Sequence, residues 1–265
     1  SRSGSRASSD AGNPASASRP AAETRYRARA RSIAPSVRAP RFAARAAVAY
    51  AGPVAAILCL DFDDTVILEN LTRALLERFA EPGWRDFERQ YHDGRLSVEE
   101  YNIAALDLVP IEVGPEEIAA FARETAHPRA GIVELADWAH WNGWLLSVVS
   151  NGFDLAVDPV LDDLGLDRVA RHRGRTARTY RWRARYVSPR GIEVREGFKL
   201  SYAAAFRANG DFVAYCGDGA SDVEAARLAP VVFARDTLLA RLQGEHARVY
   251  PFETFHDVIA VLERE

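Results

Sequence analysis

The sequence lacks or nearly lacks several residue types, and each shortage narrows what the protein can be. It contains no methionine, not even at position 1, so we expect that the chain was trimmed or that its true start lies elsewhere. Its only cysteines, Cys59 and Cys216, both lie in apolar runs. This usage is typical of buried thiols in a reducing compartment rather than of a disulfide framework. We therefore expect a cytoplasmic protein.

Long hydrophobic runs and lysine are also scarce. No stretch of about 18 consecutive apolar residues occurs, so we expect no membrane-spanning helix and no membrane partner. Lysine occurs once, at Lys199, against 33 arginines. A lone lysine in an arginine-rich chain suggests that an ammonium group is specifically needed there, although it could also have survived by chance.

Acidic residues are scarce only at the start of the chain. Residues 1–50 hold ten arginines against Asp10 and Glu23, a net charge of +8, whereas the remainder holds 24 basic and 35 acidic residues, a net charge of −11. The first 50 residues lack sustained periodicity, which predicts a disordered basic tail. Their composition resembles a transit peptide, but we favour a plain basic tail or a mis-assigned start. The acidic remainder argues against nucleic acid as a partner.

An apolar run from Val54 to Leu60 ends abruptly in aspartates. Such a run predicts a strand buried on both faces. Its carboxyl end presents Asp61 and Asp63, and ligands of open α/β sheets bind beyond the carboxyl ends of strands. Two close carboxylates repel each other unless a cation or a shared proton relieves them. The alternative interpretation is an acidic turn that caps the next helix.

The segment after this strand has helical signals only. Apolar residues recur at helical spacing over 68–79, Ser97 and Glu100 fit a capping box for a helix through Leu106, and Gly114-Pro115 can open another helix. We therefore predict a small all-helical cap at residues 67–127, inserted after strand 1, within an α/β core formed by residues 51–66 and 128–265. An insertion at this place is well positioned to act as a lid.

Beyond His127-Pro128, predicted helices and strands alternate, as in a parallel sheet. The expected fold class is α/β, a Rossmann-like three-layer α/β/α core with a parallel sheet. Residues 168–195 interrupt the pattern with ten arginines and one acid, Glu193. Arginine alternates with aromatic residues over Thr179–Val187, which predicts an exposed β-hairpin with Ser188–Gly191 as its turn. Such a pattern can bind single-stranded nucleic acid, but we favour a solvated edge ribbon.

Polar clusters stand at four points of the core segments, in the order D-x-D-x-T, Ser, Lys and G-D-G-x-x-D. These clusters are Asp61-Phe62-Asp63-Asp64-Thr65, Ser150-Asn151, Lys199 and Gly217-Asp218-Gly219-Ala220-Ser221-Asp222. In order and spacing, the sequence resembles the haloacid dehalogenase superfamily, and its phosphatases in particular, over residues 54–265. The resemblance implies the α/β core with a helical cap and a phosphatase activity.

The two aspartates of the first cluster suit phosphate ester hydrolysis. Phosphate monoesters hydrolyse extremely slowly without a catalyst, and a covalent aspartyl-phosphate divides the reaction into two easier steps. Asp61 is the expected nucleophile, and Asp63 is the expected general acid and base. Mg²⁺ prefers one or two carboxylates together with phosphate and water oxygens, which Asp61 and Asp218 can supply. The resemblance implies the Asp63 carbonyl as a further metal ligand.

The remaining cluster residues are expected to hold the phosphoryl group. Lys199 offers a compact point charge, while Ser150, Asn151 and nearby backbone N–H groups can donate hydrogen bonds. Asp222 is expected to orient Lys199 or a metal-bound water, or alternatively to cap a helix. Thr65 is as much a structural as a catalytic candidate.

The helical insertion resembles the subgroup that contains phosphoserine phosphatases. Three stretches resemble the phosphatases of methionine salvage more closely: Val149–Asp154 with Asp158-Pro159, Val232–Asp236 and Pro251–Val258. In phosphoserine phosphatases an acid nine positions after the nucleophile pairs with the substrate's amino group, and here this position is Asn70. Phosphoserine is therefore disfavoured, although the neighbouring Glu69 could substitute. Candidates for substrate contacts near the entrance are Glu69, Asn70, Arg73 and Arg95, although for any single one of them we favour a solvated helix residue.

The leading hypothesis is a Mg²⁺-dependent phosphatase that acts on a small phosphorylated metabolite. Three alternatives stay open: a phosphoserine phosphatase-like enzyme, a non-catalytic phosphate- or metal-binding relative whose basic segments recruit a partner, and phosphotransfer to an acceptor other than water. The sequence identifies neither the exact substrate nor the oligomeric state.

Overall fold

A computed structural model of the protein describes residues 56–209 and 211–264. The predicted basic tail at residues 1–50 and the first residues of the predicted first strand lie outside this range. Among the described residues, every helix is too short or too polar to cross a lipid bilayer.

The described residues form an eight-stranded sheet in the order β5-β4-β3-β2-β1-β6-β7-β8. The strands are β1 (Ala56–Leu60), β2 (Trp144–Phe153), β3 (Ala170–Arg178), β4 (Trp182–Val187), β5 (Glu193–Val194), β6 (Phe212–Gly217), β7 (Val231–Ala234) and β8 (Val249–Pro251). The six strands from β3 to β8 in this order run parallel, whereas β4 pairs antiparallel with both β3 and β5.

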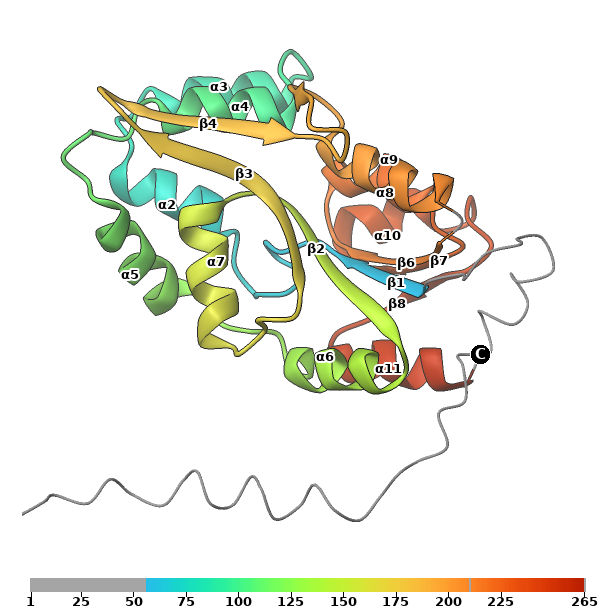
Figure 1. The fold of residues 1–265 in the computed structure, drawn as a ribbon. Coiled ribbons are helices and arrows are strands. Elements are labelled where there is room, and N and C mark those ends of the chain that lie inside the picture. The colour runs from blue at the N-terminus through green and yellow to red at the C-terminus, as the bar shows by residue number, and fades with distance from the viewer. Residues whose placement is uncertain (1–55, 210, 265) are drawn as a thin grey trace, which may run out of the picture. The chain divides into compact units, whose positions relative to one another are not determined.

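The helices that alternate with the strands after the first one are α6 (Ile132–Trp141), α7 (Asp154–Asp163), α8 (Phe198–Ala208), α9 (Val223–Ala226), α10 (Asp236–Leu242) and α11 (Phe255–Arg264). Helices α6 and α11 lie on one side of the central strands, and α8, α9 and α10 lie on the other (Figure 1). This confirms the predicted three-layer α/β/α core with a mostly parallel sheet. The strand order places β1 between β2 and β6, which brings the carboxyl ends of these three strands together.

Strand β1 shows why the central strands are continuously apolar. All five of its residues are buried. Leu58 and Leu60 belong to the apolar cluster that includes residues of α6 and α11, whereas Cys59 belongs to the cluster that includes residues of α8 and α10. Cys216 of β6 lies in the first cluster, so the two thiols face opposite sides of the sheet. Both cysteines are accordingly buried and free, as predicted.

Four helices stand between β1 and α6: α2 (Leu71–Phe79), α3 (Trp84–His92), α4 (Val98–Leu106) and α5 (Pro115–Thr125). The predicted capping box is present at α4, where Ser97 and Glu100 exchange both hydrogen bonds. Helix α5 begins with the predicted proline after Gly114. The segment leaves and rejoins the core at one place, because Ile67 and Pro128 form an isolated antiparallel bridge. Its role as a separate cap stays a prediction.

The prediction of an exposed hairpin was wrong about burial. Trp182 and Tyr186 of β4 are buried, while Tyr180 in the preceding turn is 74% exposed. Helix α4 lies beside β4 (Figure 1), and the Trp182 indole donates a hydrogen bond to the Val113 carbonyl. The alternation of arginine and aromatic residues therefore reflects a half-buried strand, one face of which is covered by the inserted segment. The predicted turn at residues 188–191 does connect β4 to β5.

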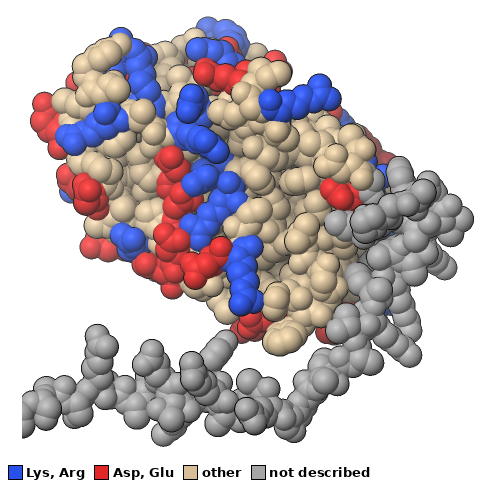
Figure 2. Space-filling model, viewed as in Figure 1, with Lys and Arg blue, Asp and Glu red and all other residues tan. Residues whose placement is uncertain are grey.

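Many arginines of this region pair with acids from other elements. Arg171 contacts Asp162 at 2.6 Å, and Arg173 pairs with Asp158, both on α7. Arg181 contacts Asp107 at 2.5 Å. Figure 2 shows basic side chains lying directly beside acidic ones on this face. In the folded chain, acids from other elements thus neutralise part of the positive charge that residues 168–195 concentrate in the sequence.

A stability prediction concerns His172 on β3. Burial and the charges of Arg173 and Arg175 together lower its pKa from 6.5 to about 4, while its ring stacks on Tyr202 with 4.1 Å between centroids. Between these pH values the unfolded chain binds more protons, so stability present above pH 6.5 is lost as the pH falls towards 4. His172→Phe keeps a ring and removes this titration.

When the pH is lowered from 7 to 5, the free energy of unfolding of His172→Phe should therefore fall by about 1 kcal/mol less than that of the wild type. This difference takes into account that solvent screens a partly exposed ring. Denaturant unfolding of both proteins at the two pH values measures this difference. An equal loss in both proteins would show that His172 does not contribute to acid sensitivity.

Candidate active site

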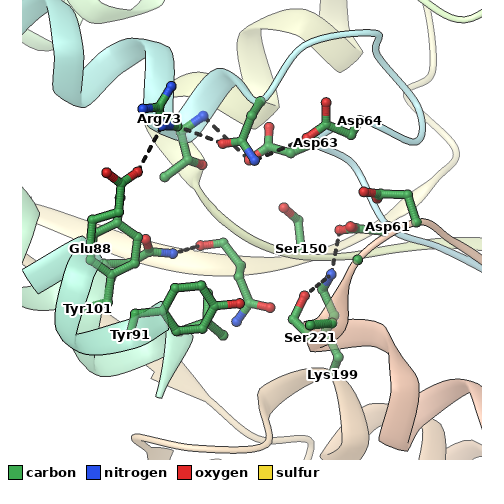
Figure 3. Close-up of a pocket in the computed structure, with 18 of the residues that line it drawn as sticks. Asp61, Asp63, Asp64, Arg73, Glu88, Tyr91, Tyr101, Ser150, Lys199 and Ser221 are labelled. Atoms are coloured by element: carbon green, nitrogen blue, oxygen red, sulfur yellow. Dashed lines mark hydrogen bonds and ion pairs between the residues drawn. The ribbon is translucent and has the colours of Figure 1, made fainter. Parts of the chain in front are cut away.

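A pocket of about 300 Å³ lies where the carboxyl ends of β1, β2 and β6 meet the inserted helices. The sequence-predicted residues line one side of it: Asp61, Asp63, Ser150, Asn151, Lys199 and Asp218. Figure 3 shows Asp61 and Lys199 facing Arg73, Glu88 and Tyr91 across the space. Of the supporting residues, Thr65 and Asp222 stand directly behind this wall, where they contact Asp218 and Lys199. Four clusters far apart in the sequence thus converge on one place.

Lys199 connects the clusters. Its Nζ lies 2.8 Å from Asp61 Oδ1 and 2.8 Å from Asp222 Oδ1, and it donates to the Ser221 hydroxyl at 3.1 Å. The side chain is only 3% exposed. Burial by itself lowers the pKa of Lys199, but Asp222 and Asp61 together raise that pKa above its ordinary value. The ammonium therefore stays charged inside the protein.

Asp222 makes both kinds of contact that the sequence had left as alternatives. Besides Lys199, its Oδ1 accepts a hydrogen bond from the Tyr215 hydroxyl at 2.7 Å. Its Oδ2 accepts from the backbone N–H groups of Gly219 at 3.0 Å and of Asp218 at 3.3 Å. The fully buried carboxylate thus holds the lysine and caps the loop after β6.

The carboxylates of Asp61 and Asp218 form a site whose chemistry fits Mg²⁺. One oxygen each of Asp61, Asp218 and Asp222 lies within 4.8 Å of the others. Burial and the charge of Asp222 raise the pKa values of Asp61 and Asp218. Because donors already occupy both oxygens of Asp222, the other two carboxylates are the available hard ligands. A divalent cation there would relieve the repulsion among them.

Asp63 points away from this cluster, towards the start of α2. Its carboxylate accepts hydrogen bonds from the backbone N–H groups of Leu71 at 3.1 Å and Thr72 at 3.4 Å. Burial raises the pKa of Asp63 to about 6, although hydrogen bonds from Thr72 and Leu71 oppose this shift. A carboxyl group with a pKa near 6 can both give and accept a proton near neutral pH.

The loop between these aspartates and α2 is held by a residue that the sequence did not single out. Arg129 donates to the carbonyls of Thr65 at 2.7 Å and of Asp64 at 2.6 Å. Asp64 has a φ of 57°, a left-handed conformation in which the chain reverses directly after the two site aspartates. Thr65 donates to Asp218 Oδ1 at 2.9 Å, which ties the β1 loop to the β6 loop.

The opposite wall of the pocket consists largely of residues that sequence reasoning missed. They come from α3 and α4, namely Glu88, Tyr91, His92, Val98, Tyr101 and Asn102. The rings of Tyr91 and Tyr101 stack with centroids 5.6 Å apart. No local motif marks these residues, because their role depends on how the inserted helices pack over the sheet.

The four residues expected near the entrance divide into two pairs. Asn70 and Arg73 line the pocket, and Asn70 caps α2 through the Arg73 N–H. Glu69 is not among the lining residues, since it accepts hydrogen bonds from the backbone and ring of His127 at 2.9 and 2.7 Å. Arg95 also lies outside the lining and pairs with Asp93. The structure therefore places Asn70 and Arg73, but not Glu69 and Arg95, among the residues that line the pocket.

Solved structures of other proteins share this fold. A structure of a phospho-aspartyl intermediate analogue of phosphoserine phosphatase aligns with a TM-score of 0.57 and 19% identity, covering 78% of this chain and 99% of that chain. A substrate-bound phosphoserine phosphatase complex aligns with a TM-score of 0.57 and 19% identity, covering 78% and 98%. At this identity the likeness establishes the fold.

Sequence comparison identifies the family. A Bacillus mycoides protein named 2-hydroxy-3-keto-5-methylthiopentenyl-1-phosphate phosphatase is 28% identical over 206 residues, which cover 76% of this chain and 93% of the relative. A protein of the same name from an Exiguobacterium species is 30% identical over 213 residues, or 78% and 96%. Residues 58–227 match the family described as haloacid dehalogenase-like hydrolase. The chain therefore belongs to the haloacid dehalogenase-like hydrolases, and within them to the phosphatases.

Proposed function

We propose that this phosphatase hydrolyses a small phosphomonoester with an uncharged leaving group, through an aspartyl-phosphate formed on Asp61 and with Mg²⁺ as its cofactor. The observation that carries the proposal is the ion pair between Asp61 and the buried Lys199, which lies inside the pocket and beside the Asp218 carboxylate. A nucleophilic carboxylate needs this neutralisation before a phosphate dianion can approach it. The conformity of both groups to the family motifs supports the same roles.

In the first step, an Asp61 oxygen forms a bond to phosphorus while the bond to the leaving-group oxygen breaks. Asp63 gives its proton to that oxygen, for which a pKa of about 6 is suitable. Lys199 and Ser150 line the pocket beside Asp61 and stabilise the charge on the phosphoryl oxygens. The leaving group departs as a neutral alcohol or enol.

In the second step, Asp63 removes a proton from a water molecule, whose oxygen attacks phosphorus. The bond to Asp61 breaks, phosphate is released and the Asp61 carboxylate is restored. The side chains of Asp61 and Asp218 and the Asp63 carbonyl would hold Mg²⁺. When bound, the ion supplies positive charge between these carboxylates and the substrate's phosphate.

The pocket wall favours a leaving group without charge. Arg73 is already paired with Glu88 at 2.8 Å and with Glu77 at 3.0 Å, so its charge is neutralised. Asn70 stands where phosphoserine phosphatases carry an acid, and its amide donates to Asp64 at 3.1 Å. Neither the carboxylate nor the ammonium group of phosphoserine would find a free partner in these two residues.

The same pocket wall is suited to a leaving group that carries uncharged hydroxyl groups. Asn102 and Asn151 line the pocket, and the part of the chain that the structure describes offers no hydrogen-bond donor to their buried side-chain oxygens. The stacked rings of Tyr91 and Tyr101 offer an apolar surface beside them. This combination supports a substrate like the one named for the methionine-salvage relatives over phosphoserine. We place the enzyme in the cytoplasm on the basis of its buried free thiols.

Phosphate release from a panel of small phosphomonoesters tests the proposal. The panel holds phosphoserine, sugar phosphates, nucleotides and the methionine-salvage intermediate, each with Mg²⁺ and with a chelator. We expect release only with Mg²⁺, and at least 10-fold faster for an uncharged leaving group than for phosphoserine, roughly the effect of leaving a charged group unpaired. Release that is unaffected by chelation, or fastest with phosphoserine, would contradict the proposal.

Replacing the nucleophile should abolish turnover without unfolding the protein. Asp61→Asn keeps the shape of the side chain but removes the attacking oxygen, so kcat should fall by roughly 10³-fold or more. Its unfolding temperature without Mg²⁺ should stay at or above that of the wild type, because one member of a repelling carboxylate cluster is gone. When the wild-type enzyme is quenched during turnover, mass spectrometry should find a phosphoryl group on Asp61.

Replacing the single lysine should be severe even though the charge is conserved. In the wild type the Lys199 ammonium lies 2.8 Å from both Asp61 and Asp222. Lys199→Arg replaces it with a planar guanidinium that does not reproduce both contacts, so kcat should fall by about 10²-fold. Arg207→Lys, near the far end of α8, is the matched control and should leave kcat unchanged. Near-normal turnover of Lys199→Arg would mean that the ammonium is not specifically needed.

A further inference from the structure

Glu99 is a buried carboxylate that the proposed chemistry does not use. It lies in the first turn of α4 and is 2% exposed. Among residues 56–209 and 211–264, no basic side chain forms an ion pair with it. A carboxylate removed from water without a cation is costly unless strong hydrogen bonds stabilise it. The contacts that stabilise Glu99 therefore indicate why it is there.

Both hydrogen bonds to Glu99 come from the segments that carry the phosphate-binding groups. Its Oε1 accepts from the Asn151 side-chain amide at 3.1 Å and from the Phe198 backbone N–H at 2.8 Å. Asn151 directly follows Ser150 near the end of β2, and Phe198 directly precedes Lys199 at the start of α8. One oxygen atom thus joins two core segments that are remote in sequence.

At α8 this contact supplies a cap that the helix does not make for itself. The residue before the helix is Gly197, which has no side chain to accept a hydrogen bond from the first turn. The Phe198 N–H is one of the amides that a helix leaves without an internal partner. A carboxylate at this end also interacts favourably with the helix dipole. Glu99 therefore fixes the first turn of α8, which contains Lys199.

At β2 a second residue on the same face of α4, Asn102, also contacts Asn151. Asn102, three positions after Glu99, donates to the Asn151 carbonyl at 2.8 Å and to the Tyr186 hydroxyl at 3.2 Å. The Tyr186 hydroxyl also donates to the Asn151 carbonyl. Asn151 is thus held at its backbone and its side chain. All four of these polar residues are buried, so water offers little competition for the bonds.

We propose that Glu99 is a positioning residue, which aligns Ser150 and Lys199 on the phosphoryl group and couples this alignment to the inserted helix α4. The same helix lines the pocket through Val98, Tyr101 and Asn102. A leaving group that seats against α4 therefore stabilises the placement of Glu99, and through it the two phosphate-binding segments. This role rests on the proposed function, since it concerns the same site.

Three variants distinguish the effects of the length of the Glu99 side chain, of its charge and of the stability of α4. Glu99→Asp keeps the charge but is one methylene shorter, so it cannot contact Asn151 and Phe198 together. Glu99→Gln loses the charge but keeps an acceptor oxygen at the same reach. Glu100→Ala is the matched control, because it breaks the capping box of α4 with Ser97 and leaves both Glu99 contacts intact.

We expect Glu99→Asp to lower kcat by roughly 10- to 100-fold, the usual effect of a misplaced catalytic group, with KM changed less than about 3-fold. Glu99→Gln should keep at least a third of wild-type kcat, and Glu100→Ala should lower the unfolding temperature without lowering kcat. A kcat for Glu99→Asp like that of Glu100→Ala, or equal losses in Glu99→Asp and Glu99→Gln, would overturn the proposal.

Orthovanadate binding, measured by thermal unfolding, tests the same role without turnover. Vanadate mimics the transferring phosphoryl group and has no leaving group. Its affinity should fall at least 10-fold in Glu99→Asp and stay near wild type in Glu99→Gln and Glu100→Ala. Unchanged affinity in Glu99→Asp would overturn the role of Glu99. If the wild type hydrolysed no compound of the panel, the proposed function would fail while this measurement still decided the role of Glu99.

Discussion

The structure depends on one buried ammonium group. Lys199 lies between Asp61 and Asp222 at 2.8 Å from each, in a place where Asp218 adds a third carboxylate. Burial and mutual repulsion raise the pKa values of Asp61 and Asp218, so these carboxylates could not stay charged side by side without compensation. The point charge of lysine meets two acceptors in different directions, which the planar guanidinium of arginine does not reproduce. We propose this geometry as the reason that a lysine stands here in a chain with 33 arginines.

The parallel sheet is what brings these charges together. Strands β1, β2 and β6 are neighbours, so Ser150 near the carboxyl end of β2 lies beside the loops that begin at Asp61 after β1 and at Asp218 after β6. The apolar residues of the strands bury them on both faces, so the loops project from a rigid base. The backbone amides of Leu71 and Thr72 at the start of α2 hold Asp63 separately, which separates the proposed general acid and base from the proposed nucleophile.

The inserted helices complete the site from the opposite direction. They supply the aromatic wall, and through Glu99 they contact the two segments that bear Ser150 and Lys199. In the roles that we propose, recognition of the leaving group and alignment of the phosphoryl group share one helix, α4. The residues of the family motifs lie at the strand ends, whereas the opposite wall of the pocket comes from the inserted helices.

The sequence by itself determined the core of this protein: the buried strands, the helix starts at Ser97 and Gly114, and the residues at the strand ends. These features follow from local rules, because apolar periodicity, capping and motif spacing act over a few residues. Only the tertiary structure decided which side chains face the substrate. Glu69 pairs with His127 and Arg95 pairs with Asp93 instead of lining the pocket, Tyr186 is a buried partner of Asn151, and Glu99 contacts Phe198 across 99 positions. Such contacts depend on how whole elements pack, and no local pattern contains that information.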